Sequence, residues 1–376
     1  MRFNLWEDCN RVPLTELLSF VVDNRGKTVP TAPSGHKLIA TNCVTNNALF
    51  PVYEKIRYLS EETYQTWFRA HPIPGDILFV NKGTPGRVCL VPDPVDFCIA
   101  QDMIALRADE SKIYPKYLFA VLRSREIQQQ IYNTNVGDVI PHFKKQFLDQ
   151  LLIPIPERSI QESIGDLYYV LSLKAERNKK INDNLQQQAQ AIYSSMFIDN
   201  PDPAWSHGHL SDLITVKYGK DHKKLADGIY PVYGSGGIMR YVERPLYNKE
   251  SVLIPRKGTL NNVMYVNQPF WSVDTMFYTE MKLPNVAKFV YHFVKAKDLA
   301  SMNAGSAVPS MTTDILNAME VVIPSASALE EFESLVAPMY EAMEANDVQS
   351  KALSQIRDTL LPKLMSGEID VSDVQL

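Results

Sequence analysis

The stretch RSIQESIGDLYYVLSLKAERNKKINDNLQQQAQAIYSSMF, residues 158–197, contains no proline and only one glycine. It is rich in Gln, Ala, Leu, Lys and Glu, which favour the interior of a helix. Its seam positions recur at heptad spacing and are mostly apolar: Ile164, Leu167, Leu171, Lys174, Asn178, Ile181, Leu185, Gln188 and Ile192. A seam of this kind requires a partner helix. At 1.5 Å per residue, about 39 residues predict a rod of roughly 58 Å, which indicates a spacer.

The partner helix lies in the same chain, because residues 327–366 repeat the pattern at a constant offset of 168. The matched seam pairs are Ile164 with Phe332, Leu167 with Leu335, Leu171 with Met339, Asn178 with Asn346, Leu185 with Leu353, and Ile192 with Leu360. The same offset holds upstream, where Gly137, Val139, Ile140 and Pro141 match Gly305, Ala307, Val308 and Pro309. The sequence therefore predicts two tandem copies of one unit, a globular part followed by a long helix.

Local signals mark the ends of these helices. Ser159 and Glu162 have the spacing of a capping box at the start of the first helix. After it, DNPDP at 199–203 predicts a stiff polar linker. Gly367 is placed to cap the end of the second helix.

The globular parts contain a repeated strand and turn. In the first part, residues 76–80 predict a strand, followed by a Gly/Pro turn and a returning strand at 88–91. SVLIPRKGTLNNVMYV at 251–266 repeats this pattern, with Lys82-Gly83-Thr84 matching Lys257-Gly258-Thr259. We also expect a short helix at 60–69, one strand at 99–108 and one helix at 114–133.

Composition limits the class of protein. The four cysteines, Cys9, Cys43, Cys89 and Cys98, include no CxxC pair, which disfavours a zinc site or a disulfide framework and is typical of a reducing cytoplasm. The start of the sequence does not resemble a signal peptide, and no run has the length of a membrane span. The net charge is −5, but residues 326–370 hold nine acidic and three basic side chains, a net of −6. The rest of the chain is therefore close to +1, and it is local charge that meets phosphate.

No catalytic constellation is evident in the sequence. GSGG at 234–237 resembles a phosphate loop, but Met239 stands where G-x-G-x-x-G requires its last glycine and there is no G-K-[ST] sequence, so a hairpin turn is the simpler interpretation. Asp93 and Glu110-Ser111-Lys112 have the outline of the carboxylate set of a metal-dependent nuclease, a short pattern that often arises by accident. The sequence has no Pro-Pro pair, which the base-holding loop of a DNA methyltransferase would need. We expect no catalytic residue and no metal site.

Basic and polar residues instead cluster in the loops of both globular parts, with tyrosines between them in the second. Lys and Arg neutralise phosphates, while Arg, Asn and Ser can read base edges. The candidate DNA-binding residues are Arg25, Lys27, Lys82, Arg87, Lys144 and Lys145 in the first part, and Lys220, Lys223, Lys224, Ser235, Arg240, Arg256, Lys257 and Thr259 in the second. A solvated charged surface is the alternative for any single residue. Whether Arg256 and Lys257 would contact phosphates or bases is left open.

The whole chain resembles the specificity subunit of type I restriction–modification systems. The central helix is similar to that family at Asn178, Ile181, Asn182, Leu185, residues 189–193 (AQAIY) and Phe197. IRDTLLPKLMSGEI at 356–369, GIYPVYGSGG and SAVPSMTTDILNAMEVVIP resemble further stretches of the family. One departure is Leu329-Glu330-Glu331, which stands where the family usually has Glu-Gln after the proline.

The resemblance implies an α+β fold with two target recognition domains, each followed by a long helix. The two helices would pack as an antiparallel coiled coil with internal pseudo-two-fold symmetry. The implied division is recognition domain 1 at 1–157, central helix at 158–198, linker at 199–205, recognition domain 2 at 206–325, distal helix at 326–366 and a tail at 367–376.

The implied function is non-catalytic recognition of double-stranded DNA. Each recognition domain would read half of a bipartite target, and the helix pair would set the spacer. Two methylation subunits would dock on the helices, and motor-nuclease restriction subunits would join them. The helix residues expected at the subunit interface are Asn178, Ile181, Leu185, Asn346, Leu353 and Leu360. No cofactor is expected on this chain, since S-adenosylmethionine, ATP and Mg would belong to the partners. Three alternatives stay open: a protein-interaction scaffold that binds peptide or glycan, an orphan DNA-binding module, and a nuclease using the Asp93 set.

Overall fold

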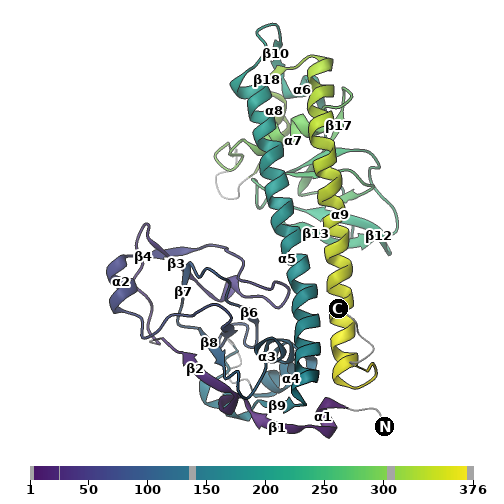
Figure 1. Cartoon of the computed structure of the whole chain (residues 1–376). Coiled ribbons are helices and arrows are strands. Elements are labelled where there is room, and N and C mark those ends of the chain that lie inside the picture. The colour runs from purple at the N-terminus through teal and green to yellow at the C-terminus, as the bar shows by residue number, and fades with distance from the viewer. Residues whose placement is uncertain (1–3, 25, 135–140, 303–309, 371–376) are drawn as a thin grey trace. The chain divides into compact units, whose positions relative to one another are not determined.

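The computed structural model describes residues 4–24, 26–134, 141–302 and 310–370. Contacts divide the chain into two units, of which the first comprises Met1–Lys180 with Ala345–Leu376 and the second comprises Ile181–Glu344. Both divisions fall inside the long helices α5 (Arg158–Ser194) and α9 (Ala326–Met365) (Figure 1). Each unit therefore contains one globular part and one end of each long helix.

The first unit is built on a four-stranded sheet in the order β2-β8-β5-β6, a three-stranded sheet in the order β4-β3-β7, and the pair β1-β9. Its strands are β1 (Asn10–Pro13), β2 (Leu18–Val22), β3 (His36–Ile39), β4 (Arg57–Leu59), β5 (Ile77–Val80), β6 (Val88–Leu90), β7 (Phe97–Ile99), β8 (Met103–Ala108) and β9 (Leu152–Ile155). Its short helices are α1 (Leu5–Asp8), α2 (Glu61–Thr66), α3 (Pro115–Leu122), α4 (Arg125–Thr134), and the 3₁₀ turns η1 (Leu14–Leu17), η2 (Thr41–Cys43) and η3 (Lys145–Gln150).

The second unit has the same topology. Its sheets have the orders β11-β17-β14-β15 and β13-β12-β16, with the pair β10-β18. Its strands are β10 (Ser206–His209), β11 (Ile214–Tyr218), β12 (Asp227–Gly234), β13 (Gly237–Val242), β14 (Ser251–Pro255), β15 (Met264–Val266), β16 (Trp271–Ser272), β17 (Met276–Met281) and β18 (Glu320–Ile323). Its short helices are α6 (Leu210–Leu213), α7 (Ala287–Lys295), α8 (Thr313–Asn317) and the π-helical turn η4 (Ser195–Asp199).

Correspondence between the units extends to strand direction. The parallel pair β3–β7 recurs as β12–β16, and every other strand pair is antiparallel in both units. The internal repeat predicted from the sequence is confirmed. Its upstream matches at 137–140 and 305–309 lie outside the described residues.

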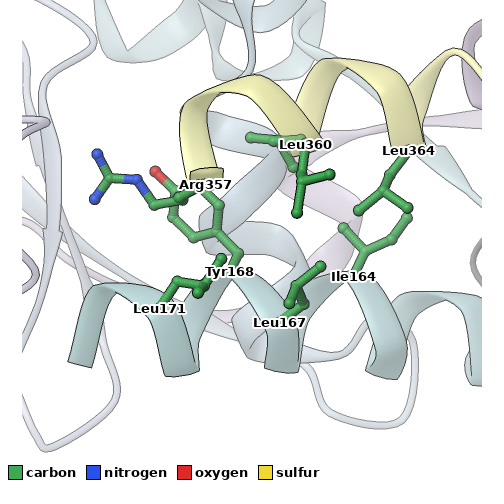
Figure 2. A pocket seen from close by; sticks show the side chains of 8 residues that line it. Ile164, Leu167, Tyr168, Leu171, Arg357, Leu360 and Leu364 are labelled. Atoms are coloured by element: carbon green, nitrogen blue, oxygen red, sulfur yellow. The ribbon is translucent and has the colours of Figure 1, made fainter. Parts of the chain in front are cut away.

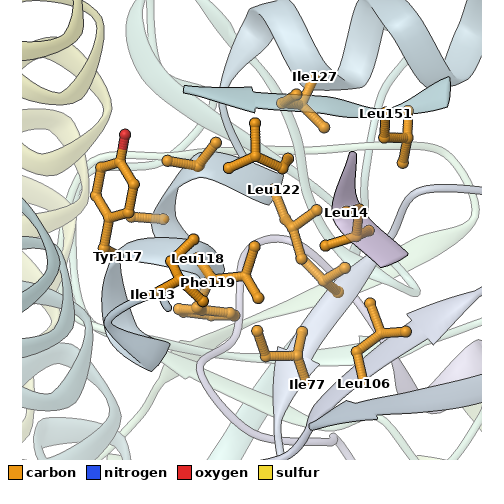
Figure 3. Close-up of a cluster of buried hydrophobic side chains, with 14 of the residues drawn as sticks. Leu14, Ile77, Leu106, Ile113, Tyr117, Leu118, Phe119, Leu122, Ile127 and Leu151 are labelled. Atoms are coloured by element: carbon orange, nitrogen blue, oxygen red, sulfur yellow. The ribbon is translucent and has the colours of Figure 1, made fainter. Parts of the chain in front are cut away.

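The core of the first unit lies between α3 and the four-stranded sheet (Figure 3). Successive side chains of β5 alternate between two clusters, because strand residues point to opposite faces. Ile77 and Phe79 join the cluster that contains α3, whereas Leu78 and Val80 join another on the opposite face. All four are buried, which explains why this strand is a continuous apolar run.

The long helices pair with each other in the first unit (Figure 2). Ile164 and Leu167 of α5 meet Leu360 and Leu364 of α9. Nearer the middle of the helices, the Arg357 guanidinium lies over the Tyr168 ring, 5.4 Å from its centroid. Since residue numbers rise along α5 as they fall along α9, the helices run antiparallel.

Asn178 is a polar contact between these helices. Its side chain is buried, and its Nδ2 lies within hydrogen-bonding distance of Asn346 O (3.3 Å), Gln349 Oε1 (2.9 Å) and Ser350 Oγ (3.2 Å). A buried polar seam residue favours one register, because other registers leave its amide unpaired. The prediction that Asn178 lies in the seam is confirmed.

The second unit shifts the buried face of α5. Ala189 and Tyr193 of α5 are buried there, as is Phe197 of the following η4, while Ile181, which the heptad spacing places in the seam, is 49% exposed. Leu335 of α9 is likewise 47% exposed. The seam prediction is wrong at these two positions. An α-helix turns once per 3.6 residues, so a strict 3.5-residue repeat drifts by about 20° per heptad.

One predicted cap is wrong and the other is confirmed. α5 begins at Arg158, so Ser159 is already helical, and the Glu157 carbonyl accepts from the Ile160 and Gln161 amides at 3.0 and 3.1 Å. Glu162 pairs instead with Arg158, at 3.0 Å. Gly367 follows α9 with a φ of 70°. This left-handed conformation is the one that favours glycine after a helix.

Three short elements also differ from expectation. The helix expected at 114–133 is divided into α3 and α4 at Arg123, whose guanidinium turns inward to donate to the Val88 carbonyl at 2.8 Å. The strand expected at 99–108 is divided into β7 and β8 by a turn, where the Asp102 carbonyl accepts from the Asn81 amide at 2.9 Å. α2 is shorter than predicted and is capped by Ser60. Asp199, placed in the linker, ends η4.

The described helices include none with the length and hydropathy that a transmembrane segment requires.

A buried histidine links three helices of the second unit. His292 of α7 is fully buried, with Nδ1 2.8 Å from Gln190 Oε1 of α5 and Nε2 2.9 Å from the Tyr340 hydroxyl of α9. The neutral ring can donate to Gln190 and accept from Tyr340. Burial lowers the pKa of His292 from 6.5 to about 4.

The second unit is therefore expected to lose stability in acid. The His292 imidazole binds a proton more readily in the unfolded chain than in the folded one. The stability that the neutral, buried ring provides is therefore complete above pH 6.5 and is lost as the pH falls to about 4. Its size is roughly 3 kcal/mol. Urea unfolding at pH 7 and pH 4.5 measures how much unfolding free energy each protein loses on acidification. This loss should be smaller in His292→Gln than in the wild type, whereas the control His207→Gln, at an exposed position, should lose as much as the wild type. Equal losses in all three proteins would contradict this assignment.

Candidate DNA interface

The predicted basic residues of the first unit gather at one edge of the four-stranded sheet. β2 and β5 both run antiparallel to β8, so their carboxyl ends meet at the same edge. Lys27 follows β2, and Lys82 and Arg87 lie in the turn after β5. The Phe143 amide donates to the Asn81 carbonyl at 2.8 Å, which brings the neighbouring Lys144 to this edge. We call the exposed residues of this set the first basic edge: Lys27, Lys82, Arg87 and Lys144.

Two predicted residues of this unit stand apart. Lys145 forms an ion pair with Asp23, and burial lowers the pKa of its ammonium. Its charge therefore serves to hold η3 to the end of β2. Arg25 lies outside the described residues.

An equivalent edge is present in the second unit. Lys220 follows β11, and its amide donates to the Ser272 carbonyl at 2.8 Å. Arg256 and Lys257 follow β14. The hairpin turn between β12 and β13 joins them, because Asn262 Nδ2 donates to the Ser235 carbonyl at 2.8 Å. The second basic edge comprises Lys220, Ser235, Arg256, Lys257 and Thr259. Lys223 and Lys224 are exposed in the loop that follows Lys220.

Arg256 is held more firmly than the lysines. Its guanidinium lies 5.4 Å from the centroid of the Tyr218 ring, and Nη1 donates to the Asp274 carbonyl at 3.3 Å. A guanidinium that is fixed in this way presents a planar set of donors. Such a group suits the bidentate recognition of a guanine edge or of a phosphate.

Arg240 has a different environment. Its Nη2 donates to the Leu225 carbonyl at 2.9 Å and to Asp227 Oδ1 at 2.8 Å. This charge therefore stabilises the segment that leads into the β12–β13 hairpin. GSGG forms the turn of that hairpin, with a φ of 109° at Gly237, so the hairpin interpretation is confirmed.

Asp93 and Glu110-Ser111-Lys112, the pattern that has the outline of a nuclease carboxylate set, bear little resemblance to a metal centre in the structure. Asp93 and Glu110 line a cavity of about 370 Å³ together with Tyr114 and Lys116. Lys112 pairs with Asp109 at 3.3 Å. Within the part of the chain that the structure describes, no three His, Cys, Asp or Glu side chains are grouped so that they could hold a metal ion.

Buried polar atoms accompany both basic edges, and the sequence-based prediction missed them. Asn24 Nδ2, Asn81 Oδ1 and Gln101 Oε1 in the first unit, and His222 Nδ1 and Ser272 Oγ in the second, have no hydrogen-bond partner among the described residues. Such atoms are few in native proteins. Asn81 directly follows the four buried residues of β5, a position that offered a signal in the sequence.

The sequence matches the family described as "Type I restriction modification DNA specificity domain" twice, at residues 21–187 and 204–332. The chain belongs to this family. The resemblance inferred from the helical motifs is thereby confirmed. As a type I specificity subunit, the chain recognises DNA target sequences, is not itself catalytic, and acts with the other subunits of a restriction–modification complex.

Two curated relatives span most of this specificity subunit. The type I restriction enzyme MjaIX specificity subunit of Methanocaldococcus jannaschii is 22% identical, covering 80% of this chain and 79% of the relative. The type I restriction enzyme HindI specificity subunit of Haemophilus influenzae is 21% identical, covering 78% of this chain and 86% of the relative. The crystal structure of the type I restriction–modification S subunit from M. genitalium has a TM-score of 0.62 and 19% identity, covering 96% of this chain and 98% of that one. This likeness concerns the fold.

Proposed function

We propose that each unit of this specificity subunit reads one half of a bipartite DNA target through its basic edge. The observation that carries the proposal is the repeated topology, which presents equivalent edges with different side chains. Asn81 in the first unit corresponds to Arg256 in the second, directly after β5 and β14, and Arg87 corresponds to Asn262. A shared scaffold suits DNA of one shape, and different side chains suit two different half-sites.

We further propose that α5 and α9 set the number of base pairs between the half-sites. Each is a single helix, of 37 and 40 residues, that contributes to both units. Altering the length of both helices would then alter the permitted spacer.

The helices are also the proposed docking surface for two methylation subunits, joined by motor-nuclease restriction subunits. Ile181 is exposed, as docking requires, whereas Asn178 is engaged within the helix pair. Leu185, Asn346, Leu353 and Leu360 are partly buried and stay predicted interface residues. In this proposal S-adenosylmethionine, ATP and Mg bind only to the partner subunits, and the complex acts in the cytoplasm.

Replacing residues 206–325 with the equivalent part of another specificity subunit tests the proposal. The chain is co-expressed with its methylation subunit, and methylated bases are sequenced in host DNA. We expect one half of the motif to change, with the other half and the spacer retained. The reciprocal replacement of residues 1–157 should change only the other half. If either replacement changed both halves, or neither, the assignment of one half-site to each unit would be wrong.

A further inference from the structure

The turns after β5 and β14 share the sequence Lys-Gly-Thr, at 82–84 and 257–259. Their glycines have nearly the same backbone conformation, with φ of 85° at Gly83 and 86° at Gly258. This left-handed region disfavours residues with a side chain, so both turns depend on glycine to form. We call them the Lys-Gly-Thr turns.

The hydrogen bonds of the two turns also correspond. The Thr84 carbonyl accepts from the Arg87 amide at 3.4 Å, and the Thr259 carbonyl accepts from the Asn262 amide at 3.1 Å. In each unit, therefore, a backbone hydrogen bond from the residue three positions after the threonine closes the turn.

In each unit, a segment distant in the sequence contacts the turn through the same backbone interactions. Lys82 forms an isolated bridge with His142, and Lys257 forms one with Ser310. Beside these bridges, the Phe143 amide donates to the Asn81 carbonyl at 2.8 Å. The Met311 amide donates to the Arg256 carbonyl at 2.9 Å in the same way. The supporting residues 142 and 310 are related by the same offset of 168 as the two long helices, whereas the turns themselves are 175 residues apart.

The lysine side chains are available for a ligand. Lys82 and Lys257 are both exposed, and neither ammonium has an ion-pair partner among the residues that the structure describes. By contrast, the flanking positions differ between the units in both chemistry and burial. Asn81 is 3% exposed, whereas its counterpart Arg256 is partly exposed beside Tyr218.

Identical groups on equivalent scaffolds can recognise only what two half-sites have in common. Two halves with different bases still share the sugar–phosphate backbone, to which positioning contacts are made. An ammonium on a flexible stem suits a phosphate as a point charge, whereas a fixed planar guanidinium is better suited to bidentate reading of a base edge. Arg256 is such a group, and it stands where the units differ.

We propose that the two Lys-Gly-Thr turns are equivalent phosphate contacts, one on each half-site, that position the units without reading bases. The inference rests on the proposed bipartite recognition, and it divides the basic edges into shared contacts with the backbone and unit-specific contacts with bases. It predicts that Lys82 and Lys257 contribute equally to binding, although they serve different half-sites.

Salt dependence of DNA binding by the full-length chain provides the test. The probes are a duplex that carries the methylated target and duplexes with one half-site scrambled. Affinities of the wild type, Lys82→Gln, Lys257→Gln and the double variant are measured between about 50 and 200 mM salt. Each lost phosphate contact should reduce the slope of log K against log salt by about 0.9. The double variant should lose about twice that, with the preference for the target unchanged.

Two control sets separate charge and position from damage to the fold. Lys82→Arg and Lys257→Arg keep the charge and should retain the wild-type slope. Lys249→Gln removes an exposed lysine that precedes β14, at the end of the strand opposite Lys257, and should leave the slope unchanged. Thermal unfolding of each variant verifies that it is folded.

The outcomes distinguish this inference from the proposed function. Wild-type discrimination with unchanged slopes in both Gln variants would overturn the phosphate contacts alone. If Lys257→Gln relaxed the sequence requirement of one half-site, Lys257 would be a base reader and the inference would also fail. A wild-type chain that binds all duplexes equally would overturn bipartite recognition itself, and this inference with it.

Discussion

Phe332→Ala is expected to lower the free energy of unfolding of the second unit by about 3–5 kcal/mol, the range for removing a large aromatic side chain from a core. Phe332 of α9 is fully buried. Its ring lies 6.2 Å from that of Tyr193, 5.2 Å from that of Phe197, both edge-on, and 5.9 Å from that of His292. These partners belong to α5, η4 and α7, so truncation leaves a cavity where three elements meet.

Leu335→Ala is the matched control on the same helix. Leu335 is 47% exposed despite its predicted seam position, and its loss should have an effect below about 1 kcal/mol. Urea unfolding, followed by the signal of the second unit, measures both variants. Similar losses for the two would mean that the helix face buried in solution is the one set by the strict heptad spacing.

Lys288→Met is expected to destabilise the second unit by about 3–5 kcal/mol, because it removes one member of a buried ion network. Lys288 of α7 is 4% exposed, and its ammonium lies 3.2 Å from Glu250 Oε1 and 2.6 Å from Glu333 Oε1. It also lies over the ring of Tyr265, 5.1 Å from the centroid. Without the lysine, two carboxylates whose side chains are 31% and 24% exposed lose the cation that lies between them.

Lys217→Met provides the comparison for an exposed pair. Lys217 and Glu280 lie 3.6 Å apart with side chains 43% and 39% exposed, and such a pair contributes roughly 0–1 kcal/mol. Combining Lys288→Met with Glu250→Gln and Glu333→Gln should recover part of the stability, since no uncompensated charge then remains. A single Lys288→Met variant as stable as Lys217→Met would disprove the role of this network.

Much of the architecture was predictable because it follows from short-range rules. A long segment without proline and with regular apolar spacing can hardly be anything but a helix, and α5 is one. The offset of 168 linked the two halves before any contact was known, and the matched sheets confirm it. The strand and turn around Lys82 followed from an apolar run that ends in Gly and Pro.

The errors arise where long-range contacts override local pattern. Ser159 has the spacing of a cap, but Gln161 Nε2 donates to the Pro156 carbonyl at 2.9 Å and its Oε1 accepts from the Tyr114 amide at 2.9 Å, which starts the helix earlier. Arg123 divides the helix expected at 114–133, because carbonyls far away in the sequence accept from its guanidinium. No local signal reports such partners.

The sequence by itself determined the family, the internal repeat, the long helices and the repeated Lys-Gly-Thr turns, since each depends on residue type and spacing along the chain. Only the tertiary structure decided which of the basic residues share an edge and which are engaged in pairs of their own. Lys145 and Arg240 carry the same charge as Lys82 and Lys257, yet Asp23 and Asp227 hold them. The physical reason is that an ion pair needs two groups within a few ångströms, and that proximity is produced by strand pairing across the fold.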